Sequence, residues 1–394
     1  MFNVKRALDF ALFGPVYVIL SLFIHPQRNS RKKIIGFASR QFKGNIKYLY
    51  LEMARYPNVQ VYYVTDDKNR AESTRKREGI DSRYYMDVKA VPLFLRTHIW
   101  VTSESPYYIP FVGFFHNLTH FYRGKHGSKW VDVWHGMGFK DVGRAEMLRT
   151  YNYDLGIVTS EFFRDYFSKK GFPSKKLKIT GFPRNDPLID QRWSKEEIER
   201  QLGIPIGRKN ILYAPTWGHK RKKSLFPWEA THIFLEEIEH FCERNNCNFL
   251  IRMHINWYIQ HKKESQLLDN LIKNAKNVFH FAPYEYEDVQ PLLFISSVLI
   301  TDWSSIANDF LLLNRPIIFL DVEFPVEEFV LSPEDRAGYI VRNKHIFFEK
   351  LKESLDYPEV HQEKRREILK KLYRYLDGNA SKRCAEEIFK LLEE

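Results

Sequence analysis

Five short apolar runs of this sequence are each accompanied by residues that can do chemistry. The runs and the residues that end or follow them are 131–134 with His135 and Gly136, 177–180 with Arg184, 211–213 with Pro215 and Thr216, 249–252 with Arg252 and His254, and 298–301 with Ser304 and Ser305. Serine hydroxyls and free backbone amides at the start of a helix bind phosphate with help from the helix dipole. Arginine binds phosphate oxygens in pairs through its planar fork. Together these residue types favour a ligand that carries phosphate.

The serine pair and the aspartate after it also have ordinary structural interpretations. Ser304 and Ser305 could be N-caps of the helix expected at 306–313, with the carboxylate of Asp302 turned to the same task. Asp309 lies four residues after Ser305, about one helical turn on, so it could reach a nucleotide ribose or base. An exposed aspartate in the middle of a helix is the ordinary alternative.

The histidines and arginines leave alternatives open as well. His135 could be a structural histidine, although the glycines beside it indicate close approach of a ligand to the backbone. His254 lies two residues after Arg252, and strand periodicity puts such a pair on one face without any functional reason. Arg184 could simply cap a linker. The joint placement of these residues at strand ends is therefore the evidence for a site.

Apolar runs alternate with amphipathic stretches along most of the chain. Strands are expected at 33–38, 59–65, 99–102, 131–134, 155–159 and 177–180 with a helix at 45–56, and then at 211–213, 249–252, 278–281, 298–301 (in an apolar run that begins at 294) and 317–320 with helices at 233–243 and 306–313. This spacing indicates right-handed βαβ units and parallel sheets. A turn-rich, charged segment at 183–195 separates the two series. We therefore predict an α/β protein with a Rossmann-like domain at 31–190 and another at 191–394, facing a cleft, with ligands bound outside the carboxyl ends of the strands.

The balance of charge favours a polyanionic partner. Lysine and arginine exceed aspartate and glutamate, which gives a formal net charge of +12 and a pI near 9.3. Nucleic acid, an anionic membrane face and a phosphorylated substrate all fit that charge, but the sequence has no recognisable nucleic-acid-binding motif. Neither GxGxxG nor GxxxxGK[ST] occurs, which argues against a dinucleotide enzyme and a P-loop NTPase.

The cysteine and histidine patterns do not favour a metal site. The three cysteines form no CxxC pair and indicate a reduced, cytosolic environment. His116, His120 and His126 share a basic loop that has no carboxylate or cysteine to complete a ligand set. The basic stretch at 218–223 is a solvated loop or a guide toward pyrophosphate or membrane. We expect no metal or cofactor of the protein's own, so any Mg²⁺ would arrive with the substrate.

Residues 1–30 are unlike the rest of the chain. The segment 7–24 has 18 residues with a single charge, Asp9, and basic residues flank both ends. It is short for a membrane span and is interrupted by Gly14 and Pro15, and residues 25–27 make a poor signal-peptide cleavage site. Basic residues on both sides fit an apolar segment that lies in the plane of an anionic membrane face. A buried core helix and a true span are the alternatives.

At these same residues the sequence resembles the CDP-glycerol glycerophosphotransferase family, the TagB/TagF-type enzymes of teichoic acid synthesis. The motifs that carry the resemblance are WHGMGFKDVG at 134–143, GFPRND at 181–186, YAPTW at 213–217, RMH at 252–254 and TDWSSIANDFLLLNRPIIF at 301–319. They extend over about 32–320 in family order, so together they are more specific than any one alone. The resemblance implies a GT-B fold. It also implies transfer of a polyol phosphate from a CDP-polyol, usually CDP-glycerol, to a lipid-linked acceptor at the cytoplasmic membrane.

The resemblance also implies which residues form the site. His135 and His254 match the histidines implicated in catalysis. The positions that match family contacts to CDP-glycerol are Gly136, Arg184, Pro215, Thr216, Arg252, Ser304, Ser305 and Asp309. There is one departure: the family commonly has Thr-Pro-Leu after the histidine and glycine, whereas this chain has Met137, Gly138 and Phe139. The departure does not affect the predicted fold, but it leaves open which CDP-polyol is the donor.

In the expected reaction an acceptor hydroxyl attacks the β-phosphorus of CDP-glycerol and CMP leaves. His135 is the expected base, because an ordinary histidine pKa lies near 6.5. His254 and Arg252 would stabilise the transferring phosphate or the departing CMP, although the two histidine roles could be exchanged. The serine pair would hold the CDP phosphates, with Asp302 supporting the turn. Positioning and charge neutralisation would supply most of the acceleration.

We therefore expect transfer of glycerol phosphate to a saccharide on undecaprenyl pyrophosphate, in the synthesis of teichoic acid or a related cell-wall or capsule polymer. The length of the chain favours addition of the first unit. The alternatives are a polymerising or ribitol-phosphate transferase of the same family, a GT-B nucleotide-sugar glycosyltransferase, and a non-enzymatic protein that binds anionic lipid or nucleic acid. The expected partners are CDP-glycerol, the lipid-linked acceptor and anionic lipids, without nucleic acid, at the cytoplasmic face of the cell membrane as a peripheral protein. The oligomeric state is not predicted.

Overall fold

The computed structural model describes residues 15, 17–27, 30–104, 127–141, 143–190, 192–216, 224–323 and 328–393. Contacts divide the chain into two compact units, one formed by Met1–His135, Gly143–Asp186 and Asn379–Glu394, the other by Gly136–Val142 and Pro187–Gly378. The border between the units falls after Asp186 and not after residue 190, and two further segments differ from the predicted domains 31–190 and 191–394. The loop that follows His135 packs within the second unit, and the C-terminal helix packs within the first. The histidine loop at 116–126 and the basic stretch at 218–223 lie outside the described residues.

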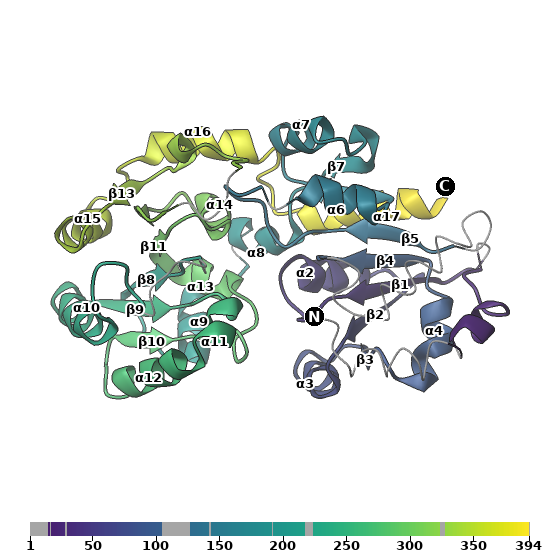
Figure 1. Ribbon diagram of the computed structural model, residues 1–394, viewed down its shortest axis with the longest axis horizontal. Helices are drawn as coiled ribbons and strands as arrows, with labels where there is room; N and C mark the ends of the chain where they lie inside the picture. The colour runs from purple at the N-terminus through teal and green to yellow at the C-terminus, as the bar shows by residue number, and fades with distance from the viewer. Residues whose placement is uncertain are drawn as a thin grey trace. The chain divides into compact units, whose positions relative to one another are not determined.

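The first unit is built on a seven-stranded sheet in which all neighbouring strands are parallel, in the order β3-β2-β1-β4-β5-β6-β7 (Figure 1). Its strands are β1 (Lys33–Ala38), β2 (Val59–Thr65), β3 (Ser82–Tyr84), β4 (Ile99–Thr102), β5 (Lys129–Asp132), β6 (Leu155–Val158) and β7 (Leu177–Ile179). Its helices include α2 (Gly44–Met53), α3 (Lys68–Glu78), α4 (Val91–Leu95), α6 (Arg144–Thr150), α7 (Glu161–Lys169) and the short η4 (Pro183–Asn185) that leads into α8 (Asp186–Ile189). The strand order reverses between β1 and β4, so their carboxyl ends form the topological switch point, where such sheets bind ligands.

The second unit has a six-stranded parallel sheet in the order β10-β9-β8-β11-β12-β13. Its strands are β8 (Lys209–Tyr213), β9 (Cys247–Ile251), β10 (Val278–His280), β11 (Ser296–Thr301), β12 (Ile317–Leu320) and β13 (Tyr339–Val341). Its helices are α9 (Lys195–Leu202), α10 (Thr231–Asn245), α11 (Ile255–Gln260), α12 (Lys262–Ile272), α13 (Gln290–Ile295), α14 (Ile306–Leu311), α15 (Lys344–Asp356) and α16 (Gln362–Leu372). Here the order reverses between β8 and β11.

Continuous burial explains why the strands form parallel sheets. Every residue of β12 is buried, and β8 and β11 are buried at all but one position each. Because alternate side chains point to opposite faces of a strand, helices must cover both faces of the sheet. The predicted α/β class with two parallel-sheet domains is confirmed.

Most predicted strands occur, with corrections at their ends. The strand predicted at 131–134 is β5 and ends at Asp132, because Trp134 adopts a left-handed φ of +46°. The apolar run from 294 is still helical through Ile295, the last residue of α13, and becomes strand at Ser296. The sequence analysis missed β3 and β13, each of only three residues, because so short a run has no measurable period.

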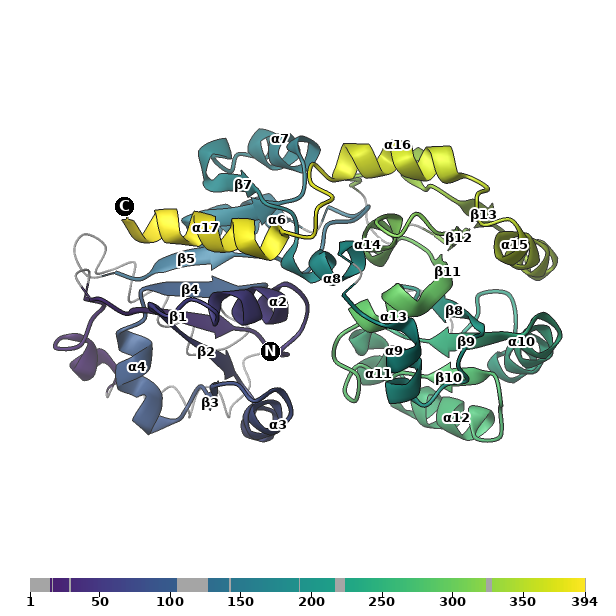
Figure 2. The ribbon, with the colours of Figure 1, turned by 180° about the vertical axis from the view of Figure 1, so that it is seen from behind.

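The C-terminal helix α17 (Ala380–Glu393) belongs to the first unit. The backbone N–H groups of Ala380 and Ser381 each donate to the buried carboxylate of Asp186, at 2.8 Å. The helix then lies along α2, as Figures 1 and 2 show from opposite sides. Its buried stripe includes Ile388 and Leu391, three residues apart, which is the spacing of an amphipathic helix that covers a core.

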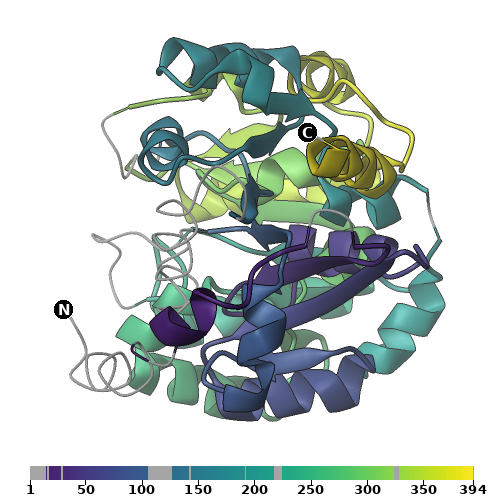
Figure 3. The ribbon, with the colours of Figure 1, turned by 90° about the vertical axis from the view of Figure 1, so that its right-hand side faces the viewer.

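The described part of the N-terminal segment begins with helical residues at 15 and 17–21, at the purple end of the chain in Figure 3. The buried hydroxyl of Tyr17 donates to the carbonyl oxygen of Tyr85 at 3.2 Å. Within the described part of the chain, no helix combines the length and the apolar character that a membrane crossing requires. Half of the apolar segment predicted at 7–24, residues 7–14 and 16, lies outside the described residues.

Candidate functional site

His135 follows β5 on a loop whose backbone is held by hydrogen bonds. The N–H of Trp134 donates to the carboxylate of Asp132 at 3.0 Å. The side-chain amide of Asn45, from the first turn of α2, donates to the carbonyl oxygens of Val133 and Trp134, each at 2.8 Å. Asn45 is buried. These bonds fix the chain immediately before His135.

The hydrogen bonds of His135 define its tautomer. Its Nδ1 lies 3.3 Å from the carbonyl oxygen of Ser103, just after β4. Because a carbonyl can only accept, Nδ1 carries the proton and Nε2 is left as an acceptor, the form that a general base requires. Burial lowers the pKa of His135 to about 4, the Ser103 hydrogen bond opposes this shift, and the positive charges of Arg184, Lys43 and Arg144 reinforce it. His135 is nevertheless an exposed residue, which weakens the effect of burial, but the downward direction of the pKa shift leaves the imidazole neutral at pH 7.

Arg184 lies beside His135, in the GFPRND segment that follows β7. Its guanidinium donates to the backbone carbonyl of His135 and lies over the ring of Phe182, 5.3 Å from the ring centre. Its backbone N–H donates to Oδ1 of Asn45 at 3.2 Å. The structure thus brings together two of the predicted site residues in the first unit, with Arg184 both supporting the histidine loop and placing a positive charge next to the candidate base.

In the second unit, two predicted motifs meet at the switch point between β8 and β11. The backbone N–H of Thr216, two residues beyond Ala214, donates to Oδ1 of Asp302 at 2.8 Å. The hydroxyl of Thr301 donates to the carbonyl oxygen of Ala214 at 2.7 Å. Asp302 is fully buried, and Pro215 is buried between these bonds. The carboxylate of Asp302 therefore ties the loop of Pro215 and Thr216 to the turn that carries the serines.

Ser304 and Ser305 are half-buried at the start of α14. The hydroxyl of Ser304 accepts from the N–H of Ile306 at 3.4 Å, a long hydrogen bond. Ser305 occupies the N-cap position but its side chain makes no capping bond. Helix capping therefore accounts for Ser304 weakly and does not account for the hydroxyl of Ser305.

Asp309 is buried on α14 and is not the exposed mid-helix aspartate of the ordinary interpretation. Its Oδ1 accepts from the hydroxyl of Tyr373 at 3.4 Å, a long hydrogen bond. Contact with a ribose or base stays a prediction.

Arg252 and His254 follow β9, the neighbour of β8. Arg252 is buried, and its guanidinium donates to the carbonyl oxygens of Phe281 at 3.0 Å and Glu287 at 3.1 Å. Burial lowers the pKa of Arg252 to about 10, which still leaves it charged at pH 7. Its hydrogen bonds hold backbone, so its direct contact with a ligand stays a prediction.

His254 is exposed and caps α11. Its Nδ1 accepts from the N–H of Asn256 at 3.2 Å. An accepting Nδ1 has no proton, so the neutral ring carries it on Nε2. The two histidines are therefore held in opposite tautomers, with an accepting Nε2 in His135 and a donating Nε2 in His254.

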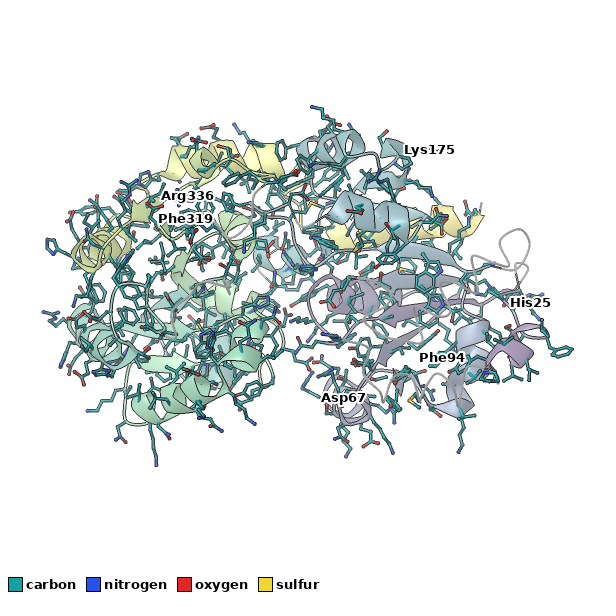
Figure 4. The ribbon with its side chains drawn as sticks, viewed as in Figure 1. His25, Asp67, Phe94, Lys175, Phe319 and Arg336 are labelled. Carbon is teal, nitrogen blue, oxygen red and sulfur yellow. The ribbon has the colours of Figure 1, made fainter. Side chains whose placement is uncertain are left out.

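The loop that follows His135 packs within the second unit, against the serine turn. Gly136 is buried and adopts a φ of +152°. The side-chain amide of Asn308 donates to the carbonyl oxygen of Met137 at 2.7 Å. Phe139 packs edge-on against Trp303 and Phe319, with ring centres 5.7 and 6.1 Å apart, and Phe319 is labelled in Figure 4. The departure from the family motif thus lies in direct contact with the turn that carries the serines.

Sequence reasoning missed the two buried asparagines that hold this loop. The sequence predicts Asn45 only as the first residue of a helix, and it assigns no role to Asn308, which lies between the serines and Asp309. A polar amide among apolar helix positions was the available signal, because a buried asparagine must find hydrogen-bond partners. The partners themselves are distant in sequence and could not be inferred. Among the described residues, no group of three or more histidine, cysteine, aspartate or glutamate side chains could hold a metal ion.

Comparisons with known proteins are consistent with this arrangement. A profile of the family described as CDP-Glycerol:Poly(glycerophosphate) glycerophosphotransferase matches residues 20–390. The teichoic acid ribitol-phosphate polymerase TarL of Staphylococcus aureus (strain NCTC 8325 / PS 47) is 26% identical over 98% of this chain and 66% of TarL, so the chain spans about two thirds of that protein. The teichoic acid glycerol-phosphate transferase of the same organism is 27% identical over 90% of this chain and 92% of its own length.

A solved structure of the wall teichoic acid polymerase TagF is also similar. It aligns with a TM-score of 0.72 at 20% identity, over 100% of this chain and 99% of the TagF chain. The likeness shows that the two chains share a fold, in agreement with the predicted GT-B-like class.

Proposed function

The chain belongs to the CDP-glycerol:poly(glycerophosphate) glycerophosphotransferase family, and on that premise we propose that it transfers glycerol phosphate from CDP-glycerol to a lipid-linked saccharide with release of CMP. The observation that carries the proposal is the placement of the family motifs. In the second unit they surround the switch point between β8 and β11, where parallel sheets bind nucleotides. The names of the similar enzymes support a product in teichoic acid or a related cell-wall polymer.

The proposed reaction is an in-line displacement at phosphorus. The acceptor oxygen forms a bond to the β-phosphorus of CDP-glycerol, and the bond from that phosphorus to the bridging oxygen breaks. CMP leaves with the bridging oxygen, and the acceptor proton passes to Nε2 of His135. The turn of Ser304 and Ser305, tied to Thr216 through Asp302, would hold the CDP phosphates.

The tautomers support a division of labour between the histidines. His135 offers an accepting Nε2 and is neutral at pH 7, as a base must be. His254 offers a donating Nε2, suited to a hydrogen bond with a phosphate oxygen or with the departing CMP. We therefore assign the base to His135.

We propose no resident metal or cofactor. The positive charges of Arg184 and Arg252 are available to offset phosphate charge, and any Mg²⁺ would accompany the CDP-polyol.

Ribitol phosphate is the second candidate for the transferred unit. The similarity to TarL, a ribitol-phosphate polymerase, favours it. The replacement of the family's threonine and proline by Met137 and Gly138 leaves the choice of donor open. Glycerol remains the first candidate. A variant of TagF, which shares this fold, was soaked with CDPG, that is, CDP-glycerol. We propose addition of a first unit, with polymerisation as the alternative.

The donor assignment is tested by turnover with a panel of donors. Purified protein and a lipid-linked disaccharide acceptor are incubated with CDP-glycerol, CDP-ribitol or a UDP-sugar, and nucleotide release and product mass are measured. We expect CMP release with CDP-glycerol and a product heavier by one glycerol phosphate. Activity with CDP-ribitol alone would move the assignment to ribitol, and activity with the UDP-sugar alone would replace the proposal with a glycosyltransferase.

We also propose that the protein works as a peripheral protein at the cytoplasmic face of the membrane, where a lipid-linked acceptor lies. The side chains of Ile19, Leu22 and Phe23 are 58, 58 and 76% exposed. His25, labelled in Figure 4, follows them, and the exposed basic residues Arg31 and Lys32 lie shortly after. Exposed apolar side chains followed by basic ones are typical of a segment that inserts in the surface of an anionic bilayer.

A further inference from the structure

Two buried asparagines hold the backbone on either side of His135. On the preceding side, the amide of Asn45 donates to the carbonyl oxygens of Val133 and Trp134, at 2.8 Å each. On the following side, the amide of Asn308 donates to the carbonyl oxygen of Met137 at 2.7 Å. Asn45 is 1% exposed and Asn308 3% exposed. Only His135 and Gly136 lie between the two fixed points.

A glycine allows the second fixed point to form. A Cβ atom built on Gly138 would lie 2.9 Å from Cβ, 3.0 Å from Cα and 3.1 Å from the backbone nitrogen of Ser305. Contacts this close involve backbone that cannot move aside, so a side chain at 138 would push the loop away from the serine turn. The N–H of Val330 donates to the carbonyl oxygen of Phe139 at 2.9 Å, which holds the next residue as well.

The two fixed points belong to different parts of the chain. Asn45 lies in the first unit and Asn308 in the second. The chain from the carbonyl of Trp134 to that of Met137 contains three peptide units and can extend by at most about 11 Å. Each asparagine therefore holds backbone within two residues of His135 in its own unit.

We propose that Asn45 and Asn308, with Gly138, are positioning residues that hold His135 in the place where it takes the acceptor proton. The inference rests on the proposed function, because it gives His135 the role of base. The asparagines contact backbone and act through His135. A base must lie within hydrogen-bond reach of its proton, and a displacement of about 1 Å costs about 100-fold in rate.

The test compares Asn45→Ala and Asn308→Ala in the wild-type and the His135→Ala backgrounds, with CMP release as the assay. In the wild-type background we expect each change to lower kcat by about 10- to 100-fold while KM for CDP-glycerol changes little. In the His135→Ala background we expect no further loss, because residues that act as a unit are not additive. Additive losses in the His135→Ala background, or an unchanged kcat in the folded single variants, would overturn the proposal.

A matched control separates positioning from stability. Asn248 is also fully buried and donates to a backbone carbonyl, that of Pro205 at 3.0 Å, away from the loop. Asn248→Ala should lower the melting temperature like the other changes and leave kcat unchanged. If either asparagine variant does not fold, Gly138→Ala tests the same loop through the Ser305 contact, with Gly156→Ala as its control, because Gly156 faces a movable Leu177 side chain at 3.3 Å.

A spectroscopic readout distinguishes failure of this inference from failure of the proposed function. The ¹⁵N chemical shifts of His135 report which ring nitrogen carries the proton. If the wild type releases no CMP from any CDP-polyol, the proposed function fails, yet the inference still predicts that Asn45→Ala and Asn308→Ala change these shifts while Asn248→Ala does not. Shifts that stay the same in both variants would contradict the inference whatever the activity.

Discussion

At the scale of the residue, the two candidate histidines differ in what their neighbours leave available. The carbonyl of Ser103 keeps the proton of His135 on Nδ1, and the N–H of Asn256 keeps the proton of His254 on Nε2. One ring can therefore take a proton through Nε2 while the other donates a hydrogen bond from the same atom. Neither assignment could be made from the sequence, because both depend on backbone groups contributed by loops and turns outside the histidine motifs.

The pH dependence of activity should follow the lowered pKa of His135. Burial is the main cause of the lowering, with the charges of Arg184 and Lys43 reinforcing it, to about 4. A base with an ordinary pKa of 6.5 would be only about one quarter neutral at pH 6, whereas we expect nearly full kcat/KM there, with the loss at lower pH. Measurement of kcat/KM from pH 3.5 to 8, a range that includes the expected acid limb, checks this.

The variant Lys43→Met tests the direction in which a neighbouring charge shifts the pKa of His135. Removing a positive charge from the surroundings of an imidazole raises its pKa, so the acid limb should move to higher pH. An acid limb near pH 6.5 in the wild type, or one that moves to lower pH in Lys43→Met, would contradict the assigned environment of His135.

At the scale of the element, the loop after β8 and the turn after β11 behave as one structure. Asp302, fully buried, accepts from the backbone of Thr216, and Thr301 donates to the carbonyl of Ala214. Both motifs were located from sequence because each follows a run of buried apolar residues. The two motifs meet because β8 and β11 are neighbouring parallel strands. The alternation of strands and helices along the sequence does not specify which strands become neighbours in the sheet.

Asp302→Ala should weaken both stability and donor binding. Loss of a buried carboxylate that accepts a backbone N–H should lower the free energy of unfolding by about 1.5–3 kcal/mol. Because the serine turn then loses its tie to the loop of Thr216, we expect KM for CDP-glycerol to rise by about tenfold, roughly the loss of one such hydrogen bond. Denaturant unfolding and initial rates measure the two effects.

Glu199→Ala is the matched control for that change. Glu199 is also a fully buried carboxylate, and it accepts from the backbone N–H of Gly207 at 3.3 Å and from the side-chain amide of Asn210 at 2.7 Å, at the start of β8 and so at the opposite end of that strand from the motifs. Its loss should cost stability and leave KM unchanged. An Asp302→Ala protein with a normal KM would separate the serine turn from donor binding.

The limits of prediction at this scale are visible in particular elements. The strand β12 was predicted because its apolar run is unbroken, and β2 because Gln60 alone interrupts its run of apolar residues before Thr65. The three-residue strands β3 and β13 carry no periodic signal, and the early end of β5 depends on one left-handed residue, Trp134. Return of α17 to the first unit depends on the carboxylate of Asp186, more than 190 residues earlier in the chain. Contacts between such distant segments leave no local pattern.

At the scale of the whole molecule, charge and exposed apolar side chains favour a membrane surface. The formal net charge is +12, and the exposed Leu22 and Phe23 lie on a segment that Tyr17 attaches to the first unit. We expect the protein to sediment with vesicles that contain anionic lipid, and less so at high salt.

The double change Leu22→Asp and Phe23→Asp should reduce vesicle binding by at least about tenfold, since burying one such side chain contributes about 1.5–3 kcal/mol. Leu267→Asp, at a similarly exposed leucine of the second unit (53% exposed), should leave binding unchanged. Equal binding by all three proteins would show that the N-terminal side chains do not meet the bilayer.

The most direct test of the central claim is the stoichiometry of transfer from CDP-glycerol labelled in its glycerol. Wild-type protein with the lipid-linked acceptor should release one CMP for each labelled glycerol phosphate incorporated, and His135→Ala should lower both rates together by about 100-fold or more. CMP release without incorporation, or full incorporation by His135→Ala, would contradict a phosphotransferase that uses His135 as its base.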